Sequence, residues 1–242
     1  MAGPARNRRG DHVKPMNPMA PMKTRLTMNP IPKRVLASLA LVGLLVAGPA
    51  AAHPHVWVAA RATVLFDKDG KIAGLRHEWA FDEMYSAFAT QGLGKNGKGP
   101  TVEDLAPLAK TNIESLTEFA FFTFAKEGGK PVEFGEPRDY SLEADDKKIV
   151  TLHFTLPLRT AVAPRTFSFQ VYDPTYFVAF GFEKKDPVAL KAAPTGCSQS
   201  IVEPPPLLAG EARKLADAKS ENFSPGADLS MRVAPRVIVA CP

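Results

Sequence analysis

The chain has 242 residues, and its 30 lysine and arginine side chains outnumber 25 aspartates and glutamates, giving a formal net charge of +5. Eight of these bases but only one of these acids precede residue 53, so residues 53–242 hold 22 bases and 24 acids. This nearly neutral part has no basic field, which argues against nucleic acid or an anionic membrane surface as a partner. About 190 residues can bury one sizeable core, so a single domain is expected.

An uncharged run at residues 35–48, VLASLALVGLLVAG, predicts a secretory signal. The run is shorter than the roughly 20 residues of a membrane-spanning helix but has the length of a signal-peptide core. Cleavage is expected within the small-residue site that ends at Ala52. The product would be a periplasmic protein that begins at His53 and does not itself span the membrane. An uncleaved anchor is the alternative.

These features divide the chain into three predicted regions. Residues 1–52 form the signal peptide region, of which residues 1–21 belong to a long leader or to a mis-called start, because Met22 opens a conventional signal peptide. Residues 53–202 form a periplasmic α+β domain. Residues 203–242 form a Pro-rich spacer, EPPP at its start, and a C-terminal segment that packs on the same domain.

The exported part begins with a predicted hairpin. Residues 55–66 are apolar and β-branched, residues 67–70 read Asp-Lys-Asp-Gly, and residues 71–81 form the return strand. In that return strand every second residue is large or apolar, which predicts one buried face made of Leu75, His77, Trp79 and Phe81.

A helix follows, capped by Thr101 and extending to about Phe119, with an apolar stripe at helical spacing (Val102, Leu105, Ala109, Ile113 and Leu116). The later predicted elements are a hairpin at 121–134, strands at 149–156, 166–171, 176–182 and 235–241, and a short helix at 207–219. Many strands in hairpin order around one main helix predict an α+β fold with a mostly antiparallel sheet. No GxGxxG or GxxxxGK[ST] motif is present, so no nucleotide is expected.

The two cysteines, Cys197 and Cys241, both lie in the last fifth of the chain. In an oxidising compartment such a pair forms a disulfide, which would tie the C-terminal segment back to the domain. Two free thiols or a soft-metal site are the alternatives.

The sharpest chemical feature is His53-Pro54-His55 at the predicted mature N-terminus. An α-amine and two neutral imidazoles suit nickel, cobalt, zinc or copper. Pro54 lacks a backbone N–H, so the amide-bound copper or nickel square of a free terminal peptide cannot fully form, and the fold must supply other ligands. His153, on the accessible face of its predicted strand, is the candidate third ligand. The alternative is a polar start to the first strand that binds nothing.

The other candidate residues favour structural roles. His77 shares a face with Trp79 and is expected in the core, and Asp82, Glu83 and Asp173 are expected to cap turns or helices rather than to act as acid and base. Residues 92–103 resemble a calcium loop in outline, but glycines occupy its first and third ligand positions, so calcium binding is not expected. With no GxSxG or HExxH motif, the sequence does not predict an enzyme.

Five ordered segments carry a family resemblance: HPHVWVAARATVLFD, GLRHEWAFDEMYS, FFTF…GKPVEF, LHFTLPL and VYDPTYFVAF. They resemble the bacterial family known as domain of unknown function 1007, over about residues 53–197. Family members are described as periplasmic components of an uncharacterised ABC-type transport system, often encoded beside nickel/cobalt exporter-type membrane proteins.

The resemblance implies a periplasmic accessory protein for transition-metal transport that passes a divalent metal to an inner-membrane transporter or permease. The family's HPH corresponds to His53 and His55, its FDEMYS to residues 81–86 and its YDPTY to residues 172–176. Three alternatives stay open. The protein could be the solute-binding component of a transporter for another ligand, a permease docking partner that binds nothing small, or a copper enzyme with an N-terminal histidine ligand.

Overall fold

The computed structural model describes residues 55–94, 99–216 and 226–242. The chain divides into two compact units, residues 1–48 and 49–242, and every described residue lies in the second. The predicted signal peptide, its cleavage site and His53 lie outside the described residues and stay predictions. Within the described part, no helix has the length and apolar character needed to cross a membrane.

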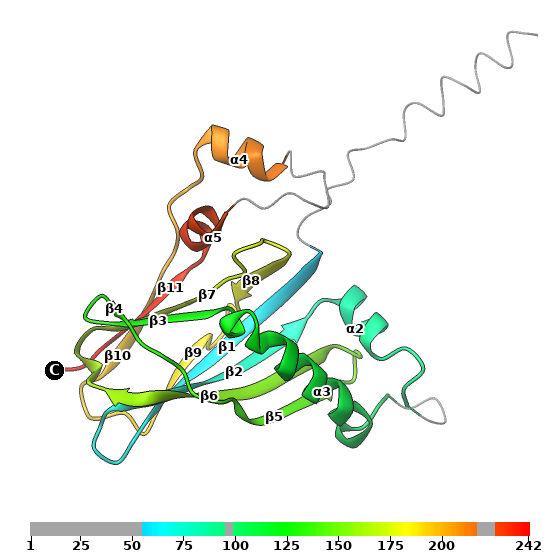
Figure 1. The fold of residues 1–242 in the computed structure, drawn as a ribbon, viewed down its shortest axis with the longest axis horizontal. Coiled ribbons are helices and arrows are strands. Elements are labelled where there is room, and N and C mark those ends of the chain that lie inside the picture. Colours follow the sequence, from blue (N-terminus) through cyan, green and yellow to red (C-terminus); the bar gives the residue numbers. More distant parts are fainter. Residues whose placement is uncertain (1–54, 95–98, 217–225) are drawn as a thin grey trace, which may run out of the picture. The chain divides into compact units, whose positions relative to one another are not determined.

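Two sheets form the framework of the described chain (Figure 1). The first has the order β5-β6-β2-β1-β8, and β9 also pairs with β1. Its strands are β1 (Val56–Phe66), β2 (Ile72–Phe81), β5 (Arg138–Ala144), β6 (Val150–Val162), β8 (Val178–Phe182) and β9 (Val188–Lys191). All its pairings are antiparallel except those of β8 and β9, which run parallel to β1.

The second sheet is antiparallel throughout, with the order β10-β11-β7-β3-β4. Its strands are β3 (Thr123–Glu127), β4 (Lys130–Pro131), β7 (Phe167–Val171), β10 (Ser198–Val202) and β11 (Arg236–Ala240). The expected α+β fold with antiparallel sheets is therefore confirmed. Besides the long helix α3 (Val102–Thr117), however, the described residues contain three shorter helices: α2 (Glu83–Ala89), α4 (Ala209–Ala216) and α5 (Ala227–Val233).

The hairpin β1–β2 forms because its residues alternate between a buried and an outer face. Val58, Ala60, Ala62 and Val64 on β1 are almost fully buried, and so are Leu75, His77 and Trp79 on β2. Phe81 at the end of β2 is only partly buried. This period of two is what a sheet with one face on a core requires.

Helix α3 begins where the sequence predicts. The Thr101 hydroxyl accepts a hydrogen bond from the Asp104 backbone N–H, and the Asp104 carboxylate accepts one from the Thr101 backbone N–H, which completes a capping box. Leu105, Ala109 and Ile113 are buried in the same core as both sheets. The helix therefore closes the core alongside the two sheets.

The segment after α3 differs from its prediction. A strand was expected from Phe121, but residues 120–122 form a 3₁₀ turn, η1 (Ala120–Phe122), with left-handed φ angles of 50°, 52° and 47°. Strand β3 begins only at Thr123. Phe121 and Phe122 are both buried, so this sharp reversal places two aromatic rings in the core.

The predicted disulfide between Cys197 and Cys241 is present, with the two Cα atoms 4.1 Å apart. It lies at the end of the β10–β11 pair, next to Ser198 and Ala240, which are partners in register. Gly196, just before the bridge, has a φ of 87°, and a Cβ atom there would approach Pro242 Cγ to 2.8 Å. Glycine is therefore required where the C-terminus folds against the bridge.

Candidate functional site

The structure does not bring the predicted ligands His55 and His153 together. His55 precedes β1, its backbone N–H donates to the Phe177 carbonyl at 2.9 Å, and its ring lies 4.7 Å from the Phe177 ring. His153 on β6 pairs in register with Glu78 on β2, and Glu78 in turn pairs in register with Arg61 on β1. Arg61 is six residues along β1 from His55, so the two histidines are about 20 Å apart along the strand direction.

His153 instead belongs to a row of polar and charged side chains on the outer face of the first sheet. Its Nε2 atom lies 3.8 Å from the Glu143 carboxylate, and Arg61 pairs with Glu183 at 4.0 Å. Within residues 55–94, 99–216 and 226–242, no three His, Cys, Asp or Glu side chains are grouped in a way that could hold a metal ion.

His77 lies in the core, as its position on β2 indicates. It is fully buried, its ring stacks on Phe154 at 4.9 Å, and Nε2 is 3.4 Å from the Thr123 hydroxyl. Burial lowers the pKa of His77 to about 3, because an imidazolium ion in this apolar environment would lose its hydration. His77 is therefore a neutral core residue.

Asp82 lies between β2 and α2 in the chain, and its carboxylate links α2 to β1 by hydrogen bonds. One carboxylate oxygen accepts the Tyr85 backbone N–H at 2.8 Å and caps the helix, and the other accepts the Trp57 backbone N–H at 2.7 Å. Ser86, one turn into α2, is buried and accepts the Val150 backbone N–H at 3.0 Å. These contacts confirm the capping role expected for Asp82.

Asp173 has the same role for the segment that leads into β8. It is only 3% exposed. One oxygen accepts the backbone N–H and the hydroxyl of Thr175 at 2.8 Å each, and the other accepts the backbone N–H groups of Phe177 and Val178 at 3.0 Å each. Since the Phe177 carbonyl holds His55, Asp173 fixes the support on which the start of β1 rests.

We expect Asp173→Asn to lower the free energy of unfolding by about 2 kcal/mol, because an amide NH₂ cannot accept the N–H groups of Phe177 and Val178. Urea unfolding of the two proteins measures the difference. Asp67→Asn is a matched control, since a single Asp67 oxygen at the surface accepts both the Asp69 and Lys71 N–H groups. Equal losses in the two variants would contradict a special role for Asp173.

An apolar pocket of about 440 Å³ lies where these segments meet. Residues from β1, β2, α2, α3, η1, β6 and the segment 173–180 line it: Val56, Val58, Trp79, Phe81, Tyr85, Asn112, Ser115, Leu116, Phe119, Phe122, Leu152, Asp173, Thr175, Phe177, Val178 and Phe180. Three of the ordered motifs in the sequence, HPHVWV, EWAFDEMYS and YDPTYFVAF, each contribute residues. We call this site the motif pocket.

Comparison with known proteins places the chain in a family. Residues 38–241 match the family model described as "Protein of unknown function (DUF1007)". The chain belongs to the DUF1007 family. An uncharacterized protein of Haemophilus influenzae is 25% identical over 166 residues, covering 68% of this chain and 79% of its own length. An uncharacterized 15.5 kDa protein of Spirochaeta aurantia is 30% identical over 117 residues, which are 48% of this chain and 82% of that protein.

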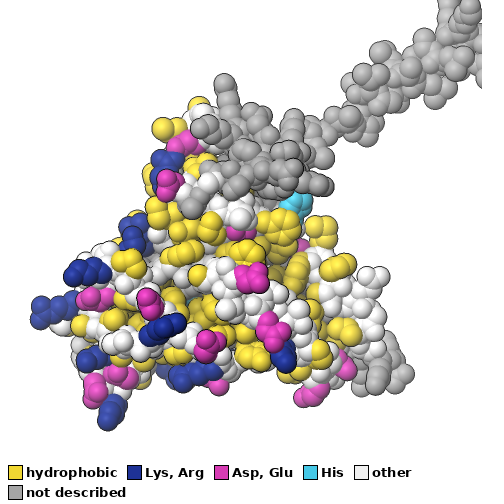
Figure 2. Space-filling view, viewed as in Figure 1, with side chains coloured by type: hydrophobic (Ala, Val, Ile, Leu, Met, Phe, Trp, Pro, Cys, Tyr) yellow, Lys and Arg dark blue, Asp and Glu magenta, His cyan; other side chains and the backbone are white. Residues whose placement is uncertain are grey.

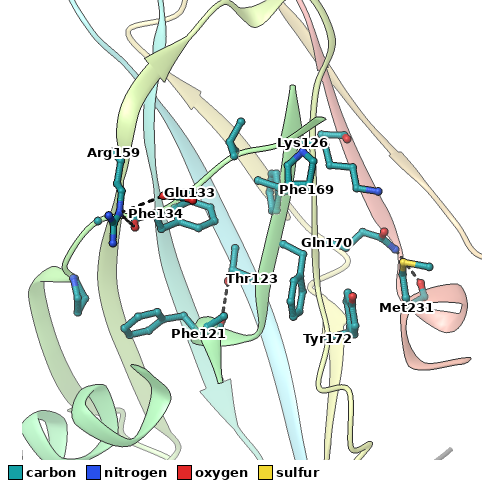
Figure 3. A pocket seen from close by; sticks show the side chains of 18 of the residues that line it. Phe121, Thr123, Lys126, Glu133, Phe134, Arg159, Phe169, Gln170, Tyr172 and Met231 are labelled. Carbon is teal, nitrogen blue, oxygen red and sulfur yellow. Dashed lines mark hydrogen bonds and ion pairs between the residues drawn. The ribbon is translucent and has the colours of Figure 1, made fainter. Parts of the chain in front are cut away.

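A larger hollow in this DUF1007 protein, about 960 Å³, lies beside β3 and the crossing segment 132–137 (Figure 3). Several of its polar side chains bond to one another or to the backbone. Arg159 pairs with Glu133 at 3.7 Å and donates to the Phe134 carbonyl, and Gln170 donates to the Met231 carbonyl at 2.9 Å. The Arg159 contacts tie β6 to the crossing segment, and the Gln170 contact ties β7 to α5, so these side chains have structural roles.

The DUF1007 motifs alone do not reveal the motif pocket. The sequence places Trp79 and Phe81 on one face, and it identifies Asp82 and Asp173 as turn residues. It does not show that Asn112 and Leu116 on α3 face them, because that contact depends on packing between distant segments. The available signal was the aromatic content of the motifs, which exceeds what turns require.

Proposed function

We propose that this DUF1007 protein is a periplasmic accessory protein of a transition-metal transport system. It would bind nickel, cobalt, zinc or copper through the α-amine and imidazole of His53 and the imidazole of His55. It would then pass the metal to an inner-membrane transporter or permease. The proposal describes a metal-handling protein and not an enzyme.

The observation that carries the proposal is how firmly His55 is held. Its backbone is bonded to Phe177, its ring packs on the Phe177 ring, and Asp173 fixes that segment with four accepted hydrogen bonds. A ligand on a rigid scaffold loses little conformational freedom when it binds a metal. His55 is also only partly buried, so a metal can reach it from solvent.

Calorimetry with zinc, nickel, cobalt and copper on protein exported with its native N-terminus tests this proposal. We expect His53→Ala/His55→Ala to weaken binding by more than the ten- to hundredfold typical of losing a supporting hydrogen bond. Affinity should fall from pH 8 to pH 5, because imidazole and α-amine groups must lose their protons to bind a metal.

Two controls make the result specific. His153→Ala should bind like the unmodified protein, since the strand register separates His153 from His55. A protein with one extra residue before His53 should bind more weakly if the α-amine is a ligand. Equal binding by the double variant, or no binding by the exported protein, would remove the metal site and favour the permease docking partner.

A further inference from the structure

We propose that the motif pocket binds an uncharged, mainly apolar organic molecule that presents a hydrogen-bond acceptor to the indole N–H of Trp79. This goes beyond the proposed metal function, because His55 is not among the described residues that line the pocket. It would make the protein a carrier or sensor of a small organic solute as well.

Volume and lining are the first part of the argument. At about 440 Å³ the pocket lies within the 300–1,000 Å³ typical of small-molecule sites, which are mostly apolar with a few polar groups. Its walls come from a sheet face, a helix and a segment fixed by Asp173. Because these walls belong to separate, well-anchored elements, the pocket is largely preformed.

The indole N–H of Trp79 is the second, independent observation. Trp79 is 1% exposed and lines the pocket, and its Nε1 atom has no hydrogen-bond partner among the described residues. The Phe154 and Phe180 rings each lie 4.8 Å from the Trp79 ring and offer no conventional acceptor. Buried donors are almost always paired in native proteins, so an unpaired one beside a cavity points to an acceptor on a bound molecule.

The other polar groups of the lining determine the charge of the ligand. Among the described lining residues, Asp173 is the only ionisable acid or base apart from the phenol of Tyr85, and both Asp173 oxygens already accept hydrogen bonds. Burial raises the pKa of Tyr85, so its phenol stays neutral. An anionic solute would lose its hydration without gaining an opposite charge, and a cationic one would compete with the N–H and O–H groups that already occupy the Asp173 carboxylate, which favours an uncharged solute.

Two half-exposed aromatic side chains, Phe119 and Phe177, lie at the edge of the pocket. Phe119 is 47% exposed and Phe177 is 48% exposed, although both line it. Hydrophobic side chains also gather on the molecular surface over β7 and β8 (Figure 2). A planar apolar ligand would cover the two rings and remove their apolar surface from water.

Fluorescence titration with Prodan, an uncharged naphthalene ketone, tests the proposal. We expect saturable binding to the exported protein with a blue shift of the emission. Ser115→Trp places a large side chain from the exposed face of α3 into the pocket and should weaken binding at least about tenfold. Glu114→Trp, at a neighbouring exposed position of α3 that is not among the described lining residues, is the matched control and should bind Prodan normally.

A second variant tests the hydrogen bond. Trp79→Phe keeps an aromatic ring but removes the N–H, so it should weaken the binding of Prodan about fivefold. The same variant should not weaken the binding of N-phenyl-1-naphthylamine, which is uncharged and apolar but has no carbonyl acceptor. Equal effects on both probes would overturn the assigned role of Trp79. No saturable Prodan binding, or equal binding by Ser115→Trp and Glu114→Trp, would overturn the pocket itself while leaving the metal proposal intact.

Discussion

Replacing Cys197 and Cys241 together by serine is expected to lower the free energy of unfolding by about 4 kcal/mol. The bridge closes a loop with a sequence separation of 44 residues, and in the chain-entropy model such a loop restricts the unfolded state by that amount. The bridge also holds β11, whose Val237 and Val239 are fully buried between β10 and β7. Urea unfolding of the oxidised protein and of the double variant measures the difference.

Reduction provides the control for this prediction. A thiol reductant should lower the stability of the unmodified protein to that of the double variant, and it should leave the double variant unchanged. Because the two proteins then share an unbridged unfolded state, their urea dependence should also agree. A double variant as stable as the oxidised protein would show that β10 and β11 hold together without the bridge.

The parts of the fold that the sequence predicts are those with a strong local pattern. Strand β2 alternates strictly, and α3 has both a capping box and an apolar stripe. Strand β5 was missed because Leu142 is its only fully buried side chain and the rest reads as a polar loop. The parallel pairing of β8 and β9 with β1 was not predictable either, since it joins segments more than 100 residues apart.

The candidate site shows the same division between local and distant information. Residue types identified His55 as a possible ligand and Asp173 as a turn residue, because both properties depend on neighbours in the chain. The choice of His153 as a third ligand used only the face of its strand. The register of three strands, which no local pattern encodes, sets its distance from His55. Contacts of α3 with the motif pocket depend on packing in the same way.

The second prediction with a large effect concerns how the stability of the folded protein depends on pH. His77 has a pKa of about 3 in the folded protein, against an ordinary value near 6.5, because burial disfavours its charged form. Below pH 6.5 the unfolded chain binds a proton that the folded protein excludes, so stability falls as the pH falls. The contribution of His77 should be about 2 kcal/mol at pH 5 and about 4 kcal/mol at pH 3.

His77→Phe should remove this loss. At pH 7 the variant should be about as stable as the unmodified protein or more so, since the imidazole Nδ1 is buried without a hydrogen-bond partner among the described residues and Thr123 still donates to the Phe121 carbonyl. Between pH 7 and pH 5, above the range where most carboxylates titrate, the free energy of unfolding of the variant should change by about 2 kcal/mol less than that of the unmodified protein.

A variant in the same aromatic cluster separates this effect from packing. Phe154→Leu alters the ring that stacks on His77 but adds and removes no titratable group. It should therefore lower the free energy of unfolding by similar amounts at pH 7 and pH 5, while His77→Phe changes the difference between them. If the unmodified protein and His77→Phe give parallel curves of stability against pH, His77 takes up its proton without unfolding, and its burial cannot be the source of acid sensitivity.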